Sequence, residues 1–522
     1  MISLLLSVVV IGCLLHLLSI GRRERGLPPG PPTVPLLGNI HLLLNFEQMH
    51  LKFMEWSRQY GEVFSIKIGS TTMVVLSSPT AIKEIVDKNS WAANSRPVNY
   101  LAGLAAGGYH ILFAADTPLL RNLRKAIARF FSPANTLRRV SIQAAESTQL
   151  LHELMTQPED FANSIQRYTH SIAMITSYGQ RVSSLTSPKM QGFYQTLHRF
   201  LHILLPGVYP PLDLVPALKY LPERWAPWLA ACRRSKSETA AFHLEHSSAA
   251  AGRAEKHGDD IPAEGESFMS SVSKMRLSQE EYDAYSYTGF SLVEAGSDTS
   301  AAFLLSLVLI LAVYPERQER ARREIEAVVG AARLPELADF KHLPFVEALV
   351  KEVIRIRPAF PMGIPHFTTE EIRYKNYVVP KDATVVLNTY SVFHNPDISE
   401  EPEVFRPERF MLSEHGTRPG MHTGFRDNFL FGAGRRICPG QSVAQATMQL
   451  TTMRLLWAFS FSAAVDLKTG RAIGRELDFY DHEFVVMPHA FECVIQLRSC
   501  EQRDVVAQAS NDARSLLRQY EH

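Results

Sequence analysis

Cys438 is the residue whose surroundings most clearly suggest chemistry. It is one of five cysteines in 522 residues, and it lies in the stretch FGAGRRICPG, residues 431–440. Helix N-termini and nearby cations lower the pKa of a thiol. A helix is expected after Pro439, and Arg435 and Arg436 come just before the cysteine. The surroundings therefore favour a thiolate, the form of cysteine that binds metals. The alternative is a buried structural cysteine beside a turn.

The distribution of the cysteines narrows the kind of metal site. They include no CxxC pair, which argues against a structural zinc site with four ligands and against a disulfide framework. A single sulfur ligand on an open coordination axis points to haem iron instead. Gly432, Gly434 and Gly440 would allow a tight bend and the close approach of a flat ligand to the backbone.

A second polar stretch, AGSDTS, interrupts a long apolar run that is expected to be helical. An acid and a hydroxyl are costly in such surroundings unless they have a task. The Thr299 hydroxyl can donate to the Ala295 carbonyl and open the helix slightly. Gly296 carries no side chain, and Asp298 could carry protons inward through water. The alternative is that Asp298 and Thr299 only pair with neighbouring groups.

A third candidate is the acid–base pair in KEVIR. Glu352 and Arg355 are three residues apart, so they share one face of a helix. The apolar residues Leu349 and Val353 beside them indicate a partly buried pair, which needs further hydrogen bonds to offset its desolvation. The alternative is a solvent-exposed ion pair of little energetic value.

The elements that must position these residues are mostly helices. A run without proline from 282 to 313, apolar all round in its second half, predicts a long helix buried in the core. Pro315 ends it, and prolines and turn residues separate the other segments. The further helices are predicted over 316–329, 345–357 and 442–461, and the short strands near 63–68, 73–76, 378–379 and 385–387.

The two ends of the chain differ from the part between them. Residues 1–20 contain no Lys, Arg, Asp or Glu, and a helix of that length spans about 30 Å, the hydrocarbon thickness of a bilayer. We predict an uncleaved transmembrane anchor there, with a cleaved signal peptide as the alternative. The basic and proline-rich residues 21–35 would form a stiff hinge on the cytosolic side. The main domain would then cover 36–500, followed by a polar, peripheral tail over 501–522.

FGAGRRICPG resembles the haem-binding signature of the cytochromes P450, which Phe431, Gly434, Arg436, Cys438 and Gly440 all match. AGSDTS is similar to the oxygen-activation motif of that family, KEVIR to its Glu-x-x-Arg pair, and FRPERF to the segment that locks this pair. The motifs stand in the family's order, and the resemblance covers nearly the whole chain. It implies a single large haem domain, mainly α with minor β, behind one N-terminal transmembrane helix. It also implies haem b with the Cys438 thiolate on the iron.

The resemblance assigns the remaining site residues. Arg409 would join Glu352 and Arg355 in a network that holds the cysteine loop. Arg124, Arg436 and His366 would bind the haem propionates, but Leu120 stands where the family usually has a tryptophan. Phe431, Gly434 and Gly440 would contact the haem, while Gly296, Asp298 and Thr299 would be catalytic. The residues implied to face the substrate are Ala295, Phe360, Met362 and Ile364.

The implied function is a monooxygenase that inserts one atom of dioxygen into a lipophilic small molecule. The apolar segment 204–229 resembles fungal microsomal members that act on polyketides, terpenoids or indole compounds. GAGRRI lacks the surroundings of a dinucleotide site, so NADPH would act through a separate flavoprotein reductase, with cytochrome b5 as a second candidate donor.

The implied location is the endoplasmic reticulum membrane, with a cytosolic domain. A net charge of +1 gives no signal for nucleic acid. The alternatives are a haem-thiolate isomerase or dehydratase, or a non-enzymatic haem protein.

Overall fold

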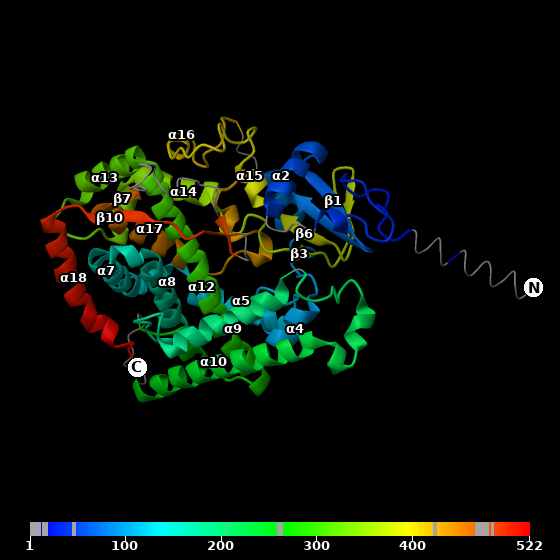
Figure 1. Ribbon diagram of the computed structural model, residues 1–522, viewed down its shortest axis with the longest axis horizontal. Helices are drawn as coiled ribbons and strands as arrows, with labels where there is room; N and C mark the ends of the chain where they lie inside the picture. Colours follow the sequence, from blue (N-terminus) through cyan, green and yellow to red (C-terminus); the bar gives the residue numbers. More distant parts are fainter. Residues whose placement is uncertain are drawn as a thin grey trace, which may run out of the picture.

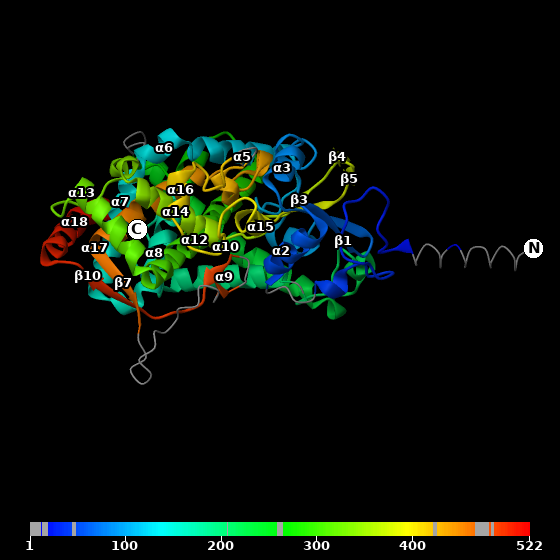
Figure 2. The same cartoon turned by 90° about the horizontal axis from the view of Figure 1, so that it is seen from above.

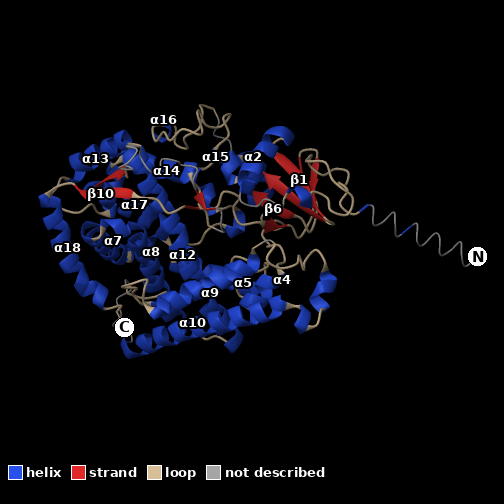
Figure 3. Cartoon of the chain, in the orientation of Figure 1, coloured by secondary structure: helices blue, strands red, loops and turns tan. Residues whose placement is uncertain are grey.

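The computed structural model describes residues 12, 19–43, 48–205, 207–257, 265–420, 425–464, 480–481 and 485–521. Most of these residues are helical, and the largest sheet lies at one end of the molecule, next to the first described residues (Figures 1 and 3). The prediction of a mainly α fold with minor β is therefore confirmed. The predicted anchor, residues 1–20, falls outside the described residues except for positions 12, 19 and 20, and it stays a prediction.

The helices begin and end mainly at prolines, glycines and capping residues. Their bounds are α2 Met49–Tyr60, α3 Pro79–Ile82, α4 Tyr100–Ala106, α5 Pro118–Phe130, α6 Pro133–Arg138, α7 Val140–Thr156, α8 Phe161–Tyr178, α9 Pro188–Leu204, α10 Pro227–His257, α11 Phe268–Ser273, α12 Gln279–Val313, α13 Pro315–Val329, α14 Pro344–Ile356, α15 Thr389–Phe393, α16 Arg409–Leu412, α17 Gln441–Ala458 and α18 Cys500–Arg518.

Helix α12 is the central element, and it runs through the middle of the helical part in both views (Figures 1 and 2). Its start is fixed by Ser278, whose hydroxyl accepts from the N–H of Glu281 while the Glu281 carboxylate accepts from the N–H of Ser278. Its first half packs into one apolar cluster, around Phe290, and its second half into another, around Leu307. Among the described helices, only α12 is long and apolar enough to cross a membrane, and most of it is buried.

The strands are short. They are β1 Val63–Ile68, β2 Thr71–Leu76, β3 His366–Phe367, β4 Ile372–Tyr374, β5 Tyr377–Val379, β6 Thr384–Leu387, β7 Phe459–Ala463, β8 Tyr480–Asp481, β9 Met487–Pro488 and β10 Cys493–Leu497. The largest sheet has the order β1-β2-β6-β3, in which β2 and β6 are parallel and the other two pairs are antiparallel. The four strands predicted from the sequence are confirmed.

The predicted helix over 442–461 is too long at its C-terminal end. Helix α17 stops at Ala458, and Phe459 is already extended, with φ −127° and ψ 159°. Phe459 to Phe461 belong to β7, which pairs antiparallel with β10. The alternation Phe-Ser-Phe suits a half-buried strand, with both aromatic rings buried and the serine between them partly exposed.

The residues before and after the main domain are attached to it. Arg23 donates to the carbonyl oxygens of Pro28, Pro31 and Ser65, at 2.9 to 3.0 Å, which fixes the proline-rich segment to β1. The neighbouring Glu24 pairs with the buried Lys67 at 2.7 Å. At the other end α18 packs along α7 at the edge of the molecule (Figure 1).

Candidate active site

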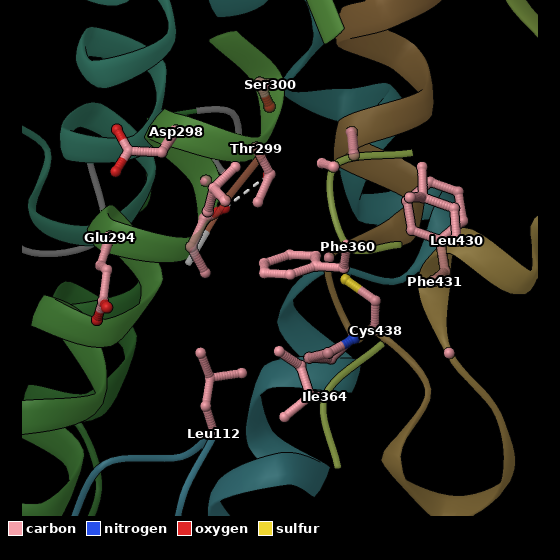
Figure 4. Close-up of a pocket in the computed structure, with 18 of the residues that line it drawn as sticks. Leu112, Glu294, Asp298, Thr299, Ser300, Phe360, Ile364, Leu430, Phe431 and Cys438 are labelled. Atoms are coloured by element: carbon pink, nitrogen blue, oxygen red, sulfur yellow. Dashed lines mark hydrogen bonds between the residues drawn. The ribbon is translucent and has the colours of Figure 1, made fainter. Parts of the chain in front are cut away.

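One cavity lies between α12 and the loop that carries Cys438 (Figure 4). Thr299 and Ala295 line it on the α12 side, and Cys438 lines it on the opposite side. Phe360 and Ile364 come from the segment after α14, and they also line the cavity. Residues that sequence reasoning picked from three separate segments of the chain therefore line one cavity.

The backbone around Cys438 is tightly held. The Cys438 N–H donates to the Phe431 carbonyl at 2.7 Å, and the Phe431 side chain lines the cavity. Gly434 has a φ of +59°, and a Cβ there would come within 2.7 Å of the Val86 carbonyl oxygen. Its N–H donates to the Asp87 carboxylate at 2.7 Å. A residue other than glycine at 434 would therefore push the loop away from its support.

The ionisation of Cys438 differs from the expectation based on sequence. Burial raises the pKa of this thiol, and the N–H of Gly440 and the guanidinium of Arg124 offset only part of that rise. Because nearby cations and backbone dipoles do not outweigh desolvation, a thiolate here needs a stronger positive partner. A metal ion bound to the sulfur would supply it. The setting suits a metal ligand better than a free nucleophile.

Three arginines converge beside Cys438. Arg124 donates to the Ile437 carbonyl at 2.6 Å, and Arg436 to the carbonyls of Asn94 and Ala114 at 2.5 and 2.9 Å. The third, Arg96, was not predicted, and it donates to carbonyl oxygens at Leu112, Ile364 and Pro365. Its only sequence signal is a charge placed just before an apolar, glycine-rich stretch, which is too weak to identify it. All three arginines line the cavity.

Within the described part of the chain, Asp116 is the one carboxylate that offsets the charge of this cluster, so its three positive charges are not matched. Burial and the charges of Arg436 and Arg124 hold the pKa of Arg96 well below its usual value, and burial together with Arg124 lowers the pKa of Arg436 to about 10. His366 donates from Nδ1 to the Ala93 carbonyl, and its pKa is lowered to about 3 by burial and by Arg96. Among the described residues Arg436 Nη1 is buried without a hydrogen-bond partner. The site therefore fits an anionic group such as the two propionates of haem.

Leu120, which stands in place of the family tryptophan, is buried in the apolar cluster of α5 and does not line the cavity. Arg121, one residue on, is exposed and pairs with Asp116 at 2.7 Å. The chain therefore offers no indole to a propionate at this position, and Arg124 is the basic residue of α5 that reaches the cavity.

On α12, the Thr299 hydroxyl donates to the Ala295 carbonyl at 2.7 Å. The Asp298 carboxylate points away from Cys438, and it contributes to a raised pKa at Tyr194 of α9 (Figure 4). A Cβ on Gly296 would lie 3.3 Å from the Cβ of Ala173 on α8. The glycine therefore allows α8 and α12 to pack closely, besides lining the cavity.

Met362 is the one predicted substrate-facing residue that the structure places elsewhere. It packs against the cluster formed by α2 and the main sheet, which includes Phe53. The cause is a turn in which the Gly363 N–H donates to the Phe360 carbonyl at 3.1 Å, with Gly363 at a φ of +57°. The turn directs Phe360 and Ile364 into the cavity and Met362 away from it.

Glu352 lies at the centre of a buried ion network. Arg355 donates to its two oxygens at 2.7 and 2.9 Å, and Arg409 donates to both at 3.1 Å. The Arg406 N–H adds a bond of 2.8 Å. The other donors of Arg355 and Arg409 reach backbone carbonyls at Phe393 and between Glu400 and Val404. The many hydrogen bonds offset the desolvation of a carboxylate that is 0% exposed.

Comparison with known proteins agrees with this site. The cytochrome P450 family profile matches residues 28–470. A cytochrome P450 monooxygenase of Armillaria gallica is 36% identical over 99% of this chain and 98% of its own length. A cytochrome P450 monooxygenase of Penicillium terrestre is 32% identical over 95% and 94%. A zebra fish cytochrome P450, solved with progesterone, shares the fold with a TM-score of 0.69 and 23% identity over 86% of this chain and 99% of its own. The chain therefore belongs to the cytochrome P450 family of haem-containing monooxygenases.

Proposed function

We propose that this enzyme inserts one atom of dioxygen into a lipophilic small molecule, with electrons that NADPH supplies through a separate flavoprotein reductase. The observation that carries the proposal is the placement of Cys438 and the Thr299–Ala295 hydrogen bond on opposite sides of one cavity. Haem b, held by Cys438, would supply the binding and activation of dioxygen.

Residues of this chain would hold the haem and deliver protons to the cavity. The cluster of Arg96, Arg124 and Arg436 would neutralise the propionates and fix the orientation of the haem. The Thr299 hydroxyl, already in the cavity, can hold a proton at its oxygen and pass it on by exchanging its bond to Ala295. Asp298 lies one residue away and would resupply that proton from the side of α12 that faces away from Cys438.

A lipophilic substrate fits the walls of the cavity. Its apolar lining includes Ile111, Leu112, Leu201, Leu292, Phe303, Phe360 and Ile364. Apolar walls with few polar groups are typical of sites for small organic molecules. The relatives that are 31–36% identical are fungal enzymes, which supports a fungal secondary metabolite of polyketide, terpenoid or indole type as the substrate.

The electron donor and the location complete the proposal. The charge-free residues 1–20 support an anchor in the endoplasmic reticulum membrane, with the domain on the cytosolic side, where a membrane-bound NADPH reductase and cytochrome b5 would reach it. The AGSDTS motif, complete in this chain, favours this reaction over an isomerase or dehydratase that needs no reductase.

Two measurements test the proposal. The reduced protein with carbon monoxide should give the Soret band typical of thiolate-bound haem, and Cys438→Ser should abolish that band. Reconstitution with a fungal NADPH reductase and candidate lipophilic compounds should then give substrate-dependent NADPH consumption with one oxygen atom from ¹⁸O₂ in the product. A Cys438→Ser variant with unchanged turnover would refute the assignment.

A further inference from the structure

A buried acid in the cavity is not used by the reaction described above. Glu294 precedes Ala295 on α12 by one residue, lines the cavity and is 7% exposed. Figure 4 shows it on α12, on the opposite side of the cavity from Cys438. Its carboxylate oxygen Oε2 accepts from Nε2 of His110 at 2.9 Å. Within the described part of the chain His110 is its one hydrogen-bond or ion-pair partner.

The contacts of His110 indicate which of its ring nitrogens donates to Glu294. The backbone N–H of Leu112 donates to Nδ1 at 3.3 Å, so Nδ1 is an acceptor and Nε2 carries the hydrogen that Glu294 receives. His110 is 2% exposed, and its ring is stacked on Phe200 with centroids 5.1 Å apart. His110 therefore holds the Glu294 side chain in place through this hydrogen bond.

Glu294 has fewer hydrogen-bond donors around it than a buried carboxylate normally has. A buried carboxylate normally has a cation or several donors around it, whereas Glu294 has a single hydrogen-bond donor among the described residues. Three of the arginines that line the same cavity gather around Cys438 and bind backbone carbonyls there, and the fourth, Arg357, lies over the ring of Tyr480. The remaining lone pairs of Glu294 are therefore available to accept a hydrogen bond from a molecule in the cavity.

Ser291 provides a second, independent observation. It is three residues before Glu294, so both lie on one face of α12, and both line the cavity. Ser291 is 1% exposed, and its hydroxyl has no hydrogen-bond partner among the described residues. Buried hydroxyls are normally hydrogen-bonded, and an unpaired one calls for a missing partner.

We propose that Glu294, positioned by His110, and Ser291 form a recognition site for a hydroxyl group, and that the substrate is a largely apolar molecule with a hydroxyl that reaches this site. A substrate hydroxyl can donate to Glu294 and accept from Ser291 at the same time. A protonated amine can donate to Glu294 but has no lone pair for Ser291, so the hydroxyl is the better match. This inference rests on the proposed function of the same cavity.

The test uses matched probes on the haem-loaded full-length protein. Binding of 4-phenylphenol and of biphenyl, which differ only by one hydroxyl, is measured by equilibrium dialysis and by the shift of the Soret band. We expect 4-phenylphenol to bind about tenfold or more tightly, because its hydroxyl would satisfy buried polar groups at Glu294 and Ser291 that biphenyl leaves without partners. Glu294→Gln keeps the size of the side chain, and it should remove most of this preference without weakening biphenyl.

Ser291→Ala should reduce the preference severalfold, while Thr176→Val is the matched control. Thr176 lines the same cavity, but its hydroxyl already donates to the Ile172 carbonyl at 2.6 Å, so its removal should change neither affinity. Equal binding of the two probes, or a preference that survives in both Glu294→Gln and Ser291→Ala, would overturn the proposal.

A third probe separates the hydroxyl from a cation. If Glu294→Gln weakens 4-phenylbenzylamine more than 4-phenylphenol, the site recognises a cation and the proposal is wrong. Dialysis needs neither a reductase nor turnover. A selective site in a protein without monooxygenase activity would therefore refute only the proposed function, and an active enzyme without the preference would refute only this inference.

Discussion

Arg96, Arg124 and Arg436 place three cationic side chains in one buried region, where desolvation and mutual repulsion lower the pKa values of Arg96 and Arg436. Such a cluster is costly without an anion. Each arginine also donates to backbone carbonyls, so the side chains are held in place before any ligand binds. The cluster thus provides a preformed site whose electrostatic cost is relieved by the haem carboxylates.

Arg96 gives the first prediction at the residue scale. Arg96→Met should lower the ratio of haem to protein severalfold, because it removes a propionate partner and three bonds that hold Leu112 and the Ile364–Pro365 segment. The pyridine haemochromogen assay measures this ratio. Arg121→Met, which removes an exposed arginine of α5, is the control. An unchanged haem content in Arg96→Met would show that the cluster has no part in haem retention.

Thr299 gives the second prediction at the residue scale. Thr299→Ala should still consume NADPH with reductase and substrate, but a large share of the electrons should appear as free hydrogen peroxide, since the hydroxyl that supplies the proton is lost. Thr299→Ser keeps the hydroxyl and should restore most of the coupling. The measurement is the ratio of product to NADPH consumed. Full coupling in the alanine variant would contradict a role in proton delivery.

At the scale of elements, the Glu352 network joins α14 to the segment that precedes α16. The carboxylate receives bonds from Arg355 of α14 and from Arg406 and Arg409, more than fifty residues further along the chain. The arginines in turn bind carbonyl groups between Glu400 and Val404. The network therefore fixes this irregular segment against α14, in addition to the apolar contacts that buried Phe405 makes with the core.

Glu352→Ala should leave two buried arginines without their anion. Breaking a buried ion pair by removing one partner typically costs about 3–5 kcal/mol, so we expect a large fall in the thermal unfolding midpoint and protein without haem. Glu347→Ala is the control, because it removes an exposed partner of Lys351 from the same helix. Normal haem content in Glu352→Ala would refute the structural role assigned to the network.

The sequence predicted elements better than it predicted contacts. Helix α12 and three of the four strands of the main sheet, β1, β2 and β6, could be located because periodicity, Pro315 and turn residues act locally. The direction of Met362 could not, since it depends on a turn of only four residues. Arg96 and His110 were missed for a different reason. Their partners, at Ile364 and Glu294, lie 268 and 184 residues away in the chain, and no local pattern encodes such a contact.

At the scale of the whole molecule, buried histidines join the helices that pack on α12. His170 of α8 is hydrogen-bonded through Nδ1 to the Ser297 hydroxyl at 2.9 Å, and His243 of α10 to the Ser286 hydroxyl at 2.8 Å. Burial, the main cause in both, lowers the pKa of His170 to about 3 and that of His243 to about 4. Both residues are therefore neutral in the folded protein and sit between packed helices.

These shifts predict a loss of stability in acid. Between pH 6.5 and about 4 both histidines bind a proton in the unfolded chain but stay neutral in the folded chain. The free energy of unfolding should therefore fall as pH falls, by up to about 1.4 kcal/mol per histidine and pH unit. Above pH 6.5 both states are neutral there and this contribution is constant. Thermal unfolding followed by circular dichroism across this range measures the slope. His170→Gln cannot titrate and should flatten the slope, whereas His41→Gln at the surface should not. A slope unchanged in His170→Gln would mean that other groups govern acid unfolding.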